Sequence, residues 1–167
     1  MLKGILIERA TLAHVGGILK LAEDNSPQRG GDLTGSLPRE AVVMTIQMLP
    51  SLVAVRDGQV IGFLLAWEKA SSGHPCVKAM LEAYQGSHDA YVYGPICVDA
   101  SARGEGLAGR MFEELRKLLP DREGILFIRK GNESSLRAHH KMGMRKTAEY
   151  TYEGNTFFVF AYNSQHS

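Results

Sequence analysis

The stretch Arg-Gly-Glu-Gly-Leu-Ala-Gly at residues 103–109 joins a predicted strand to the most regular helix pattern of the sequence. Behind it, apolar residues recur from Leu107 to Leu119 with the period of an α-helix, and Pro120 ends the pattern. Free N–H groups at a helix start, left uncovered by glycines, form a site for phosphate oxygens, and the helix dipole adds to the attraction. A tight turn alone would need one glycine rather than three. The pattern therefore predicts an anion site, with the charge of Arg103 beside it.

The rest of the sequence predicts strands and helices on both sides of this loop. The preceding strand, 91–98, is interrupted by Gly94-Pro95, because proline cannot donate to a ladder and glycine favours a bulge. Further strands are predicted at 5–9, 52–56, 60–67, 124–128, 147–153 and 156–162, with hairpin turns at Asp57-Gly58 and Gly154-Asn155. Helices are predicted from the cap Thr11 to about Asn25, at 39–49, within 68–90, at 107–119, and at 133–142 between the cap Asn132 and Gly143. This order predicts a mixed α/β or α+β sheet covered by helices.

Length and composition define the class of protein. The 167 residues fit one domain, and 44% hydrophobic with 22% charged residues describe a globular chain, which excludes disordered and collagen-like proteins. Nineteen basic and eighteen acidic residues give a net charge of +1, so no global field attracts a polyanion, and we expect no nucleic-acid partner. Eighteen glycines are about 11% of the chain, against roughly 7% in average proteins, which indicates unusual backbone tasks.

Cysteine usage and hydropathy indicate the compartment. Cys76 and Cys97 form no CxxC pair and no metal-ligand spacing, so we expect reduced thiols packed as small hydrophobes and no bound metal. No run approaches the roughly 18 apolar residues of a membrane span, and the N-terminus shows no cleavage-like site. These features predict a soluble cytoplasmic protein that does not bind membranes.

Gly104, Gly106 and Gly109 also match G-x-G-x-x-G, the dinucleotide-binding fingerprint. That fingerprint starts directly at the strand end and is followed by an acid roughly 20 residues later. Here five residues separate Val98 from Gly104, and the next strand ends in two basic residues at 129–130. Basic residues there would suit a 2′-phosphate, so a NADP-type site remains an alternative.

The loop and its surroundings resemble the GNAT superfamily of acetyl-CoA dependent N-acetyltransferases. The family's pyrophosphate loop, Arg/Gln-x-x-Gly-x-Gly/Ala, is matched by residues 103–108. A second family motif, an asparagine followed by a helix that ends in Gly-Phe, is similar to Asn132 and the residues up to Gly143-Met144. The order of elements matches from Ile5 to Tyr162. The resemblance implies a single GNAT-like domain over residues 1–167, with a central, mixed, mostly antiparallel sheet of about seven strands flanked by helices.

The resemblance implies that acetyl-CoA is the acyl donor. The loop would hold its pyrophosphate, and the backbone of residues 96–98 would pair with the pantetheine arm, because the strand interruption exposes N–H and C=O groups. An amide of Cys97 or nearby would donate to the thioester oxygen, and Asn132 would reach the arm or only cap its helix. The expected cofactor-binding residues are Ile96, Cys97, Val98, Arg103, Gly104, Glu105, Gly106, Leu107, Ala108, Gly109, Asn132 and Ser135.

The reaction implied by the resemblance is direct attack of a primary amine on the acetyl thioester, with a thiolate leaving. The family often uses a tyrosine as acid seven residues after the asparagine, where this sequence has His139. This departure resembles a small-amine branch with Asn-x-x-Ser-x-x-x-His. His139 as acid and the amide of Cys97 are therefore the expected catalytic groups, and His140 is the weaker acid candidate. The base is expected among Glu68, Asp89, Tyr91, Tyr93 and ordered water.

Two other classes of protein fit parts of the pattern. A coenzyme A binding or sensing module would keep the cofactor site without the acid and base. A thiol enzyme would use Cys97 as nucleophile and His139 as its partner, although no third, orienting residue is identified.

The acceptor amine is not defined by the sequence. Residues 25–40 and 68–90 are expected to line the binding site of the amine, and they carry charges of both signs. Exposed strand edges would support a dimer, so a monomer and a homodimer are both open. The carboxylate pairs Glu113-Glu114 and Asp121 with Glu123 are expected to be solvated surface.

Overall fold

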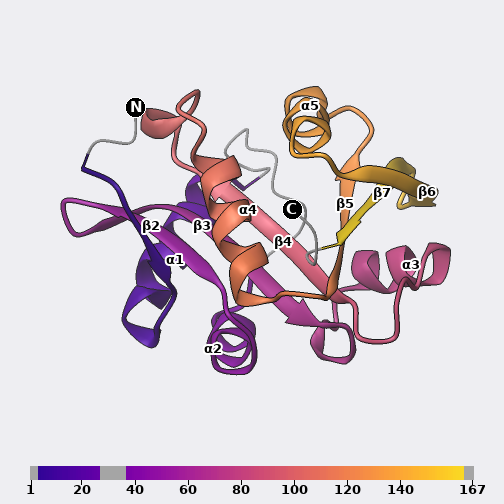
Figure 1. The fold of residues 1–167 in the computed structure, drawn as a ribbon, viewed down its shortest axis with the longest axis horizontal. Helices are drawn as coiled ribbons and strands as arrows, with labels where there is room; N and C mark the ends of the chain where they lie inside the picture. The colour runs from indigo at the N-terminus through magenta and orange to yellow at the C-terminus, as the bar shows by residue number, and fades with distance from the viewer. Residues whose placement is uncertain (1–3, 27–36, 164–167) are drawn as a thin grey trace. The chain divides into compact units, whose positions relative to one another are not determined.

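Seven strands form one mixed sheet in the computed structural model, which describes residues 4–26 and 37–163 (Figure 1). The strand order is β1-β2-β3-β4-β5-β7-β6, with β4 and β5 parallel and the pairs β1·β2, β2·β3, β5·β7 and β6·β7 antiparallel. The strands are β1 Leu6–Arg9, β2 Leu52–Arg56, β3 Gln59–Glu68, β4 Tyr91–Val98, β5 Glu123–Arg129, β6 Arg145–Tyr152 and β7 Asn155–Asn163. The helices are α1 Val15–Asp24, α2 Arg39–Met48, α3 Pro75–Ala83, α4 Leu107–Leu118 and α5 Glu133–Lys141, with 3-10 turns η1 Leu12–His14, η3 Lys69–Ser71 and η4 Ala100–Ala102. The predicted mixed, mostly antiparallel sheet flanked by helices is confirmed.

The chain divides into two compact units. The first unit comprises Met1–Ala66 and Gly94–Leu118, and the second comprises Trp67–Tyr93 and Leu119–Ser167. Strands β3 and β4 each begin in one unit and end in the other, and the chain passes between the units again after α4. Helices α1, α2 and α4 belong to the first unit, whereas α3 and α5 belong to the second.

In the first unit, α4 packs closely on strand β3. The helix buries the apolar stripe predicted from its periodicity, including Leu107, Met111 and Leu115. A Cβ added to Gly62 of β3 would meet the side chains of Leu107 and Met111 at 3.3 Å each, so glycine allows the helix to approach the strand. The amide of Asp99 also donates to the carbonyl oxygen of Ile61 at 2.8 Å. These contacts anchor both ends of the loop that leads from β4 into α4.

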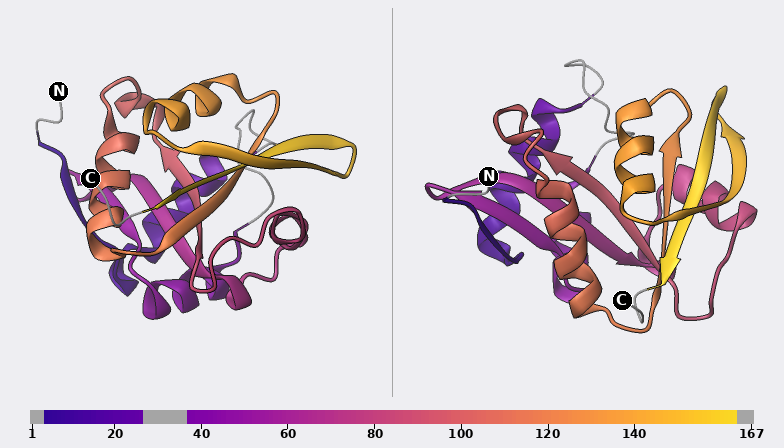
Figure 2. Two further views of the ribbon diagram at one scale, coloured as in Figure 1. Left: turned by 45° about the vertical axis from the view of Figure 1, so that its right-hand side comes forward. Right: turned by 45° about the horizontal axis from the view of Figure 1, so that its top comes forward.

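In the second unit, tyrosine rings cover the start of β5. Tyr162 of β7 lies opposite Gly124 of β5, and a Cβ at Gly124 would overlap the Tyr162 ring. The Tyr162 ring is packed edge-on against Tyr91 and Tyr93, with centroid distances of 6.2 and 5.9 Å. Figure 2 shows β6 and β7 of this unit as a long, twisted hairpin. The second unit thereby forms an aromatic core around the first residues of β4.

Most predicted turns and caps are confirmed, with one shift in register. Asp57 and Gly58 have φ of 52° and 77°, as a two-residue hairpin turn between β2 and β3 requires. In the last hairpin, Tyr152 pairs with Asn155, and the positive φ values belong to Glu153 and Gly154. The predicted Gly154-Asn155 turn is therefore wrong by one residue, because β7 begins at Asn155 and the left-handed positions precede it.

The remaining irregular segments agree with their sequence patterns. Gly94 interrupts β4 with a φ of +109°, and the Gly94-Pro95 peptide bond is cis. Gly143 follows α5 with a φ of +89°, as a helix-ending glycine should. The first predicted helix begins as the 3-10 turn η1 before α1 continues to Asp24. Most of the predicted acceptor loop, residues 27–36, lies outside the described residues.

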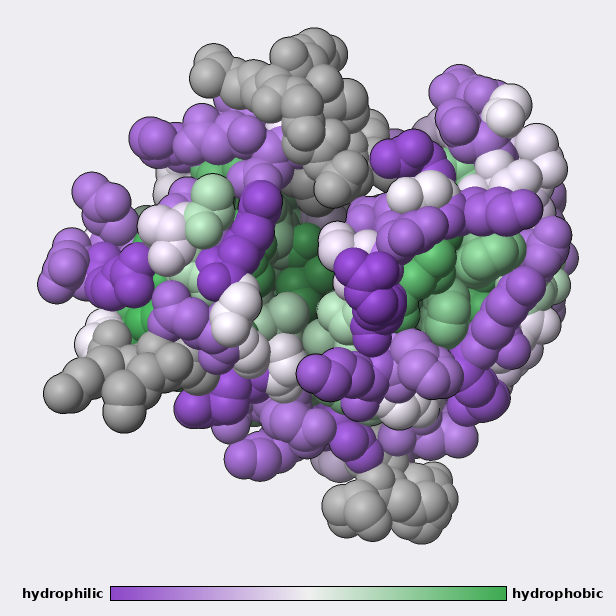
Figure 3. All heavy atoms as spheres, turned by 90° about the horizontal axis from the view of Figure 1, so that it is seen from above, coloured by the Kyte–Doolittle hydropathy of each residue, from purple (hydrophilic) through white to green (hydrophobic). Residues whose placement is uncertain are grey.

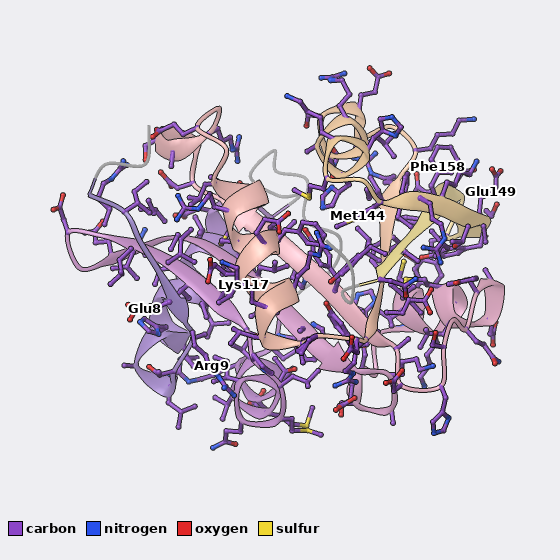
Figure 4. All side chains as sticks on the ribbon, in the orientation of Figure 1. Glu8, Arg9, Lys117, Met144, Glu149 and Phe158 are labelled. Carbon is purple, nitrogen blue, oxygen red and sulfur yellow. The ribbon has the colours of Figure 1, made fainter. Side chains whose placement is uncertain are left out.

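Hydrophilic side chains predominate on the face shown in Figure 3. On the β6–β7 hairpin, Glu149 and Phe158 stand in register (Figure 4), and Nζ of Lys146 lies 2.9 Å from Oε1 of Glu149 and 4.0 Å from the centroid of the Phe158 ring. Within residues 4–26 and 37–163, no helix is both long enough and apolar enough to span a membrane.

Candidate functional site

The loop that opens α4 runs from Arg103 to Gly106. Gly104 and Gly106 have φ of +82° and +79°, a left-handed conformation that residues with a Cβ rarely adopt. A Cβ added to either would meet no atom of the described residues within 4 Å. The backbone conformation therefore favours glycine at both positions, and no described residue fills the space that a Cβ at either position would take. Such a loop leaves the helix-start N–H groups accessible to an anion.

Gly109 lies in the first turn of α4, where neither backbone conformation nor packing explains a glycine. Its φ lies outside the left-handed range, and an added Cβ would again meet no described atom within 4 Å. A glycine inside a helix costs roughly 0.5–1 kcal/mol relative to alanine. The residue keeps the backbone of this turn approachable at close range, as a bound ligand would require.

Arg103 is held by two hydrogen bonds within the first unit. Its Nε donates to the carbonyl oxygen of Val98 at 3.1 Å, and its Nη2 donates to Oδ1 of Asn25 at 2.6 Å. Asn25 in turn donates from Nδ2 to the carbonyl oxygen of Leu21 at 2.9 Å, which fixes its amide group. The positive charge expected beside the loop is thus oriented by the ends of β4 and α1. The sequence offered no signal for Asn25, because it lies 78 positions away.

Cys97 is buried near the end of β4, between the partly exposed Ile96 and Val98. Burial raises the pKa of its thiol to about 12, although the charge of Arg103 opposes this shift. A thiol with such a pKa is protonated at neutral pH and is a poor nucleophile. The structure therefore argues against Cys97 as an attacking thiolate.

Asn132 caps α5 in the second unit. Its Oδ1 accepts hydrogen bonds from the amide of Ser135 at 3.3 Å and from Oγ of Ser134 at 3.4 Å. The helix cap, one of the two roles expected from the sequence, is therefore present. The cap uses only Oδ1, so the Nδ2 group keeps its capacity to donate.

His139 of α5 is bonded through both ring nitrogens. Nδ1 lies 2.8 Å from the carbonyl oxygen of Ser135, which can only accept, so Nδ1 carries the proton. Nε2 lies 3.0 Å from Oη of Tyr93 and accepts a hydrogen bond from this hydroxyl. Burial lowers the pKa of His139, although the bond to Ser135 opposes this shift. The imidazole is therefore neutral at pH 7, whereas His140 on the same helix is exposed.

The other predicted bases take part in structural contacts of the second unit. Glu68 accepts from Nη2 of Arg122 at 2.9 Å, and Nε of Arg122 donates to the carbonyl oxygen of Asp89 at 2.8 Å. The same guanidinium lies 5.5 Å from the centroid of the Tyr91 ring, and the Tyr91 hydroxyl pairs with that of Tyr162. A carboxylate paired with arginine and a buried, paired phenol are poor bases. Tyr93 is a buried phenol as well, and its hydroxyl donates to Nε2 of His139. The two residues are 46 positions apart in the sequence, so nothing in the sequence indicated this contact.

Glu123 at the start of β5 is buried, so the expectation that it is solvated was wrong; Asp121 is exposed as expected. The Glu123 carboxylate accepts hydrogen bonds from Oη of Tyr84 and the amide of Ser87, both at 2.6 Å, and from Nη2 of Arg145 at 3.3 Å. Burial alone would raise the pKa of Glu123, but these donors outweigh it and hold the pKa below its ordinary value. The carboxylate fastens the segment between α3 and β4 to β5.

Within the described residues, no group of three or more His, Cys, Asp or Glu side chains is arranged to hold a metal ion. The positions expected to bind a cofactor fall in both units. Residues 96–98 and 103–109 lie in the first unit, and Asn132, Ser135 and His139 lie in the second.

Comparison with known proteins identifies one matching family. The sequence model of the acetyltransferase (GNAT) family matches residues 22–144. None of the curated proteins matches the chain in sequence.

Three solved structures illustrate the shared fold. An N-acetyltransferase from Staphylococcus aureus Mu50 is 20% identical, with 96% of this chain and 99% of that chain covered and a TM-score of 0.71. A putative acetyltransferase from Salmonella typhimurium, solved with its cofactor acetyl-CoA, is 14% identical, with 98% and 95% covered and a TM-score of 0.72. The ribosomal-protein-S18-alanine N-acetyltransferase from Escherichia coli is 12% identical, with 98% and 96% covered and a TM-score of 0.70.

Proposed function

The chain belongs to the GNAT acetyltransferase family, and we propose that it transfers an acetyl group from acetyl-CoA to a primary amine by direct attack in a ternary complex. The observation that carries this proposal is the open glycine loop at the start of α4. Gly62 and Gly124 are explained by the side chains packed against them, whereas Gly104, Gly106 and Gly109 face no described atom within 4 Å. The left-handed backbone favours glycine at positions 104 and 106, and an anion that approaches the helix start would account for the open surroundings of all three.

The loop is suited to the pyrophosphate of coenzyme A. In this proposal the backbone N–H groups of residues 104–109, including those of Glu105, Leu107 and Ala108, surround the phosphate oxygens. The guanidinium of Arg103 adds a charge that two protein hydrogen bonds already orient. A site of this kind needs no strongly basic protein, in agreement with the net charge of +1.

The pantetheine arm is proposed to lie along residues 96–98 of β4. The left-handed Gly94 and the following proline interrupt the strand just before this segment, which favours pairing of its backbone with an amide-bearing ligand. The amide of Cys97 would donate to the thioester oxygen as negative charge develops there. Nδ2 of Asn132 and Oγ of Ser135 are the side-chain donors proposed to contact the arm.

The chemistry requires one proton to leave the amine and one to reach the departing thiolate. A free primary amine has a pKa of about 10 and must be neutral to attack. A thiolate, whose thiol has a pKa of about 8.5, leaves more easily when an acid is near. His139 is the proposed source of this acid–base function. It is neutral at pH 7 and hydrogen-bonded to a hydroxyl, so it can accept a proton and return it.

We further propose that residues 1–167 act as a single cytoplasmic domain, as a monomer or a homodimer, on a small-molecule or peptide amine. The family match supports one domain, because residues 22–144 include parts of both units. A coenzyme A binding or sensing module is the second candidate function. It is favoured by one observation: both ring nitrogens of His139 are bonded to protein groups rather than directed outward.

Isothermal titration with acetyl-CoA and with NADPH tests the cofactor site. Gly106→Ala is expected to weaken acetyl-CoA binding at least about tenfold, because the added methyl and the strained backbone both disturb the loop. Gly58→Ala is the matched control: its φ of +77° is close to the +79° of Gly106, no described atom lies within 4 Å of an added Cβ at either position, and Gly58 lies in a hairpin turn. Tighter binding of NADPH than of acetyl-CoA would overturn the proposal.

Turnover then separates an enzyme from a sensor. Thiol release from acetyl-CoA is measured across a panel of small amines and peptides, and acetylated products are identified by mass spectrometry. Transfer to at least one amine is expected. Tight binding of acetyl-CoA without transfer to any amine would instead support the sensing module.

A further inference from the structure

We propose that His139 is an acid-sensitive latch, which holds α5 against β4 while its imidazole is neutral and releases the helix when the imidazole is protonated. Asn132 caps this helix and Ser135 lies in its first turn, so release of α5 would displace two of the groups proposed to contact acetyl-CoA. The latch itself stands on contacts within the second unit, whereas its link to acetyl-CoA rests on the proposed function.

Helix α5 is attached to the sheet of its unit through one residue. Of residues 133–141, His139 alone is buried, and every other side chain is partly or fully exposed. The hydrogen bond of 3.0 Å from Oη of Tyr93 to Nε2 of His139 joins the helix to β4. Among the described residues, no other hydrogen bond or ion pair connects residues 133–141 with a strand. The helix therefore has no buried apolar side chain of its own to hold it when this bond is lost.

The groups that face the imidazole are uncharged. Tyr93 reaches it from β4, with ring centroids 5.5 Å apart, and Tyr162 of β7 packs edge-on against Tyr93 at 5.9 Å. On α5 itself, the carbonyl oxygen of Ser135 accepts the Nδ1 proton at 2.8 Å. Glu133, the acid of this helix, is paired with Arg137 at 3.8 Å, and its side chain is 80% exposed. Within the described residues, no carboxylate is therefore bonded to the imidazole to compensate a positive charge.

Protonation of the imidazole removes the acceptor that Tyr93 uses. An imidazolium carries a hydrogen on both nitrogens, so Nε2 can no longer accept from the hydroxyl, and the positive charge stays buried. Burial accordingly lowers the pKa of His139 below its ordinary value of 6.5, although the bond to Ser135 opposes the shift. Docking of α5 is thus fully favoured above pH 6.5, and it weakens as the pH falls from 6.5 through the folded-state pKa.

Release of α5 is a local event. Isolated helices shorter than about 12–15 residues are marginal in water, so the nine residues of α5 are expected to lose their helical structure once released. The pairing of β5 with β7 and of β7 with β6 does not involve the helix and is expected to remain. The contribution of Glu123 is complete above pH 4.5, so the latch begins to weaken at a higher pH than the contacts of that carboxylate.

Hydrogen exchange of residues 133–141 between about pH 7.5 and 5.5 tests the latch without any ligand. Protection factors, which correct for the pH dependence of intrinsic exchange, are expected to fall by up to about tenfold per pH unit below 6.5 in the wild type. Strands β5 and β7 are expected to keep their protection. Tyr93→Phe is expected to lower the protection of α5 about twofold to tenfold at neutral pH, because one hydrogen bond is removed.

His139→Gln keeps a neutral side chain at every pH. Its α5 protection is expected to stay within about twofold over the same pH range. His140→Gln is the matched control, because His140 is exposed on the same helix, and it is expected to keep the pH dependence of the wild type. The latch would be overturned by constant α5 protection in the wild type, by a fall that β5 and β7 share, or by a fall that persists in His139→Gln. The first two outcomes need no variant, so they decide the question even if His139→Gln does not fold.

The same exchange measurement with acetyl-CoA tests the link to the cofactor. A ligand that contacts Asn132 and Ser135 binds the docked helix, so acetyl-CoA at about 100 times its Kd is expected to raise α5 protection at least about tenfold. Unchanged α5 protection in the saturated complex would keep the latch and overturn these two contacts. No binding of acetyl-CoA by the wild type in isothermal titration would overturn the proposed function, while exchange of the free protein decides the latch independently.

Discussion

Nη2 of Arg103 lies 2.6 Å from Oδ1 of Asn25, which caps the end of α1. The bond crosses 78 positions of sequence, and Nε of the same guanidinium reaches the carbonyl oxygen of Val98. The arginine beside the glycine loop is thus oriented before any anion arrives. Such preorganisation strengthens binding because less side-chain freedom is lost when the ligand is held.

Asn25→Ala is expected to weaken acetyl-CoA binding about threefold to tenfold, because one hydrogen bond to an exposed charged group contributes about 0.5–1.5 kcal/mol. Isothermal titration measures the Kd. Arg56→Ala is the control, since Arg56 is another arginine of the first unit, is partly exposed and is bonded to Ser101. If Asn25→Ala binds like the wild type while Arg103→Ala does not, Asn25 has no positioning role.

Gly109→Ala is expected to raise the free energy of unfolding by about 0.5–1 kcal/mol and at the same time to weaken acetyl-CoA binding. Alanine favours the helix, and no described atom within 4 Å opposes its methyl group. Gly16→Ala in α1 is matched, because that glycine is also helical and open, and it should change stability without changing the Kd. Urea unfolding and isothermal titration measure the two effects. Unchanged binding by Gly109→Ala would show that the ligand stays away from this turn.

Glu123→Gln is expected to lower the free energy of unfolding by about 1–3 kcal/mol at pH 7, because an amide cannot replace the carboxylate toward Tyr84, Ser87 and Arg145. The pKa of Glu123 is lower in the folded state than its ordinary value of 4.5. Its contribution is therefore complete above 4.5 and is lost as the pH falls through the folded-state value, so wild type and variant should converge in acid.

Urea unfolding at pH 7 and at steps below pH 4.5 measures this convergence. Glu113→Gln is the matched control, because Glu113 is an exposed carboxylate that pairs with Arg116 on α4. It should change stability by less than about 0.5 kcal/mol at any pH. A loss of stability in Glu123→Gln that is equal at pH 7 and in acid would show that the charge of Glu123 does not matter.

Neither thiol is expected to react readily in the folded protein. Cys76 and Cys97 are both buried, and burial raises the pKa of each thiol. Alkylation at neutral pH should be at least about tenfold slower than in urea, as mass spectrometry of the intact protein can follow. Incubation with acetyl-CoA alone should add no mass. An acetyl group found on Cys97 would restore the thiol mechanism.

Local patterns predicted the parts of the fold that depend on neighbouring residues. The sequence predicted the apolar stripe of α4, the helix caps at Asn132 and Gly143, and the turn at Asp57-Gly58. Each of these features depends on residues that are close together in the sequence. The last hairpin was misplaced by one residue, since the sequence around Gly154 allowed two registers that only strand pairing distinguishes.

Long-range contacts were not predictable from the sequence. Glu123 resembles a surface carboxylate until Tyr84 and Ser87 are brought to it from 39 and 36 positions earlier. The pairing of Tyr93 with His139 has the same origin, because each residue was a separate candidate and only folding joins them. Spacing along the chain identifies the types of residue at a site, whereas their hydrogen bonds depend on tertiary structure.

The passage of the chain between the two units has a consequence for biosynthesis. The first unit needs Gly94–Leu118 in addition to Met1–Ala66, so it is incomplete on the ribosome until α4 has emerged. The second unit needs the final hairpin β6–β7, which is translated last. Neither unit is a contiguous stretch, and a nascent chain released before α4 would contain neither of them whole. Termination before α4 is therefore expected to give unfolded fragments rather than a folded unit.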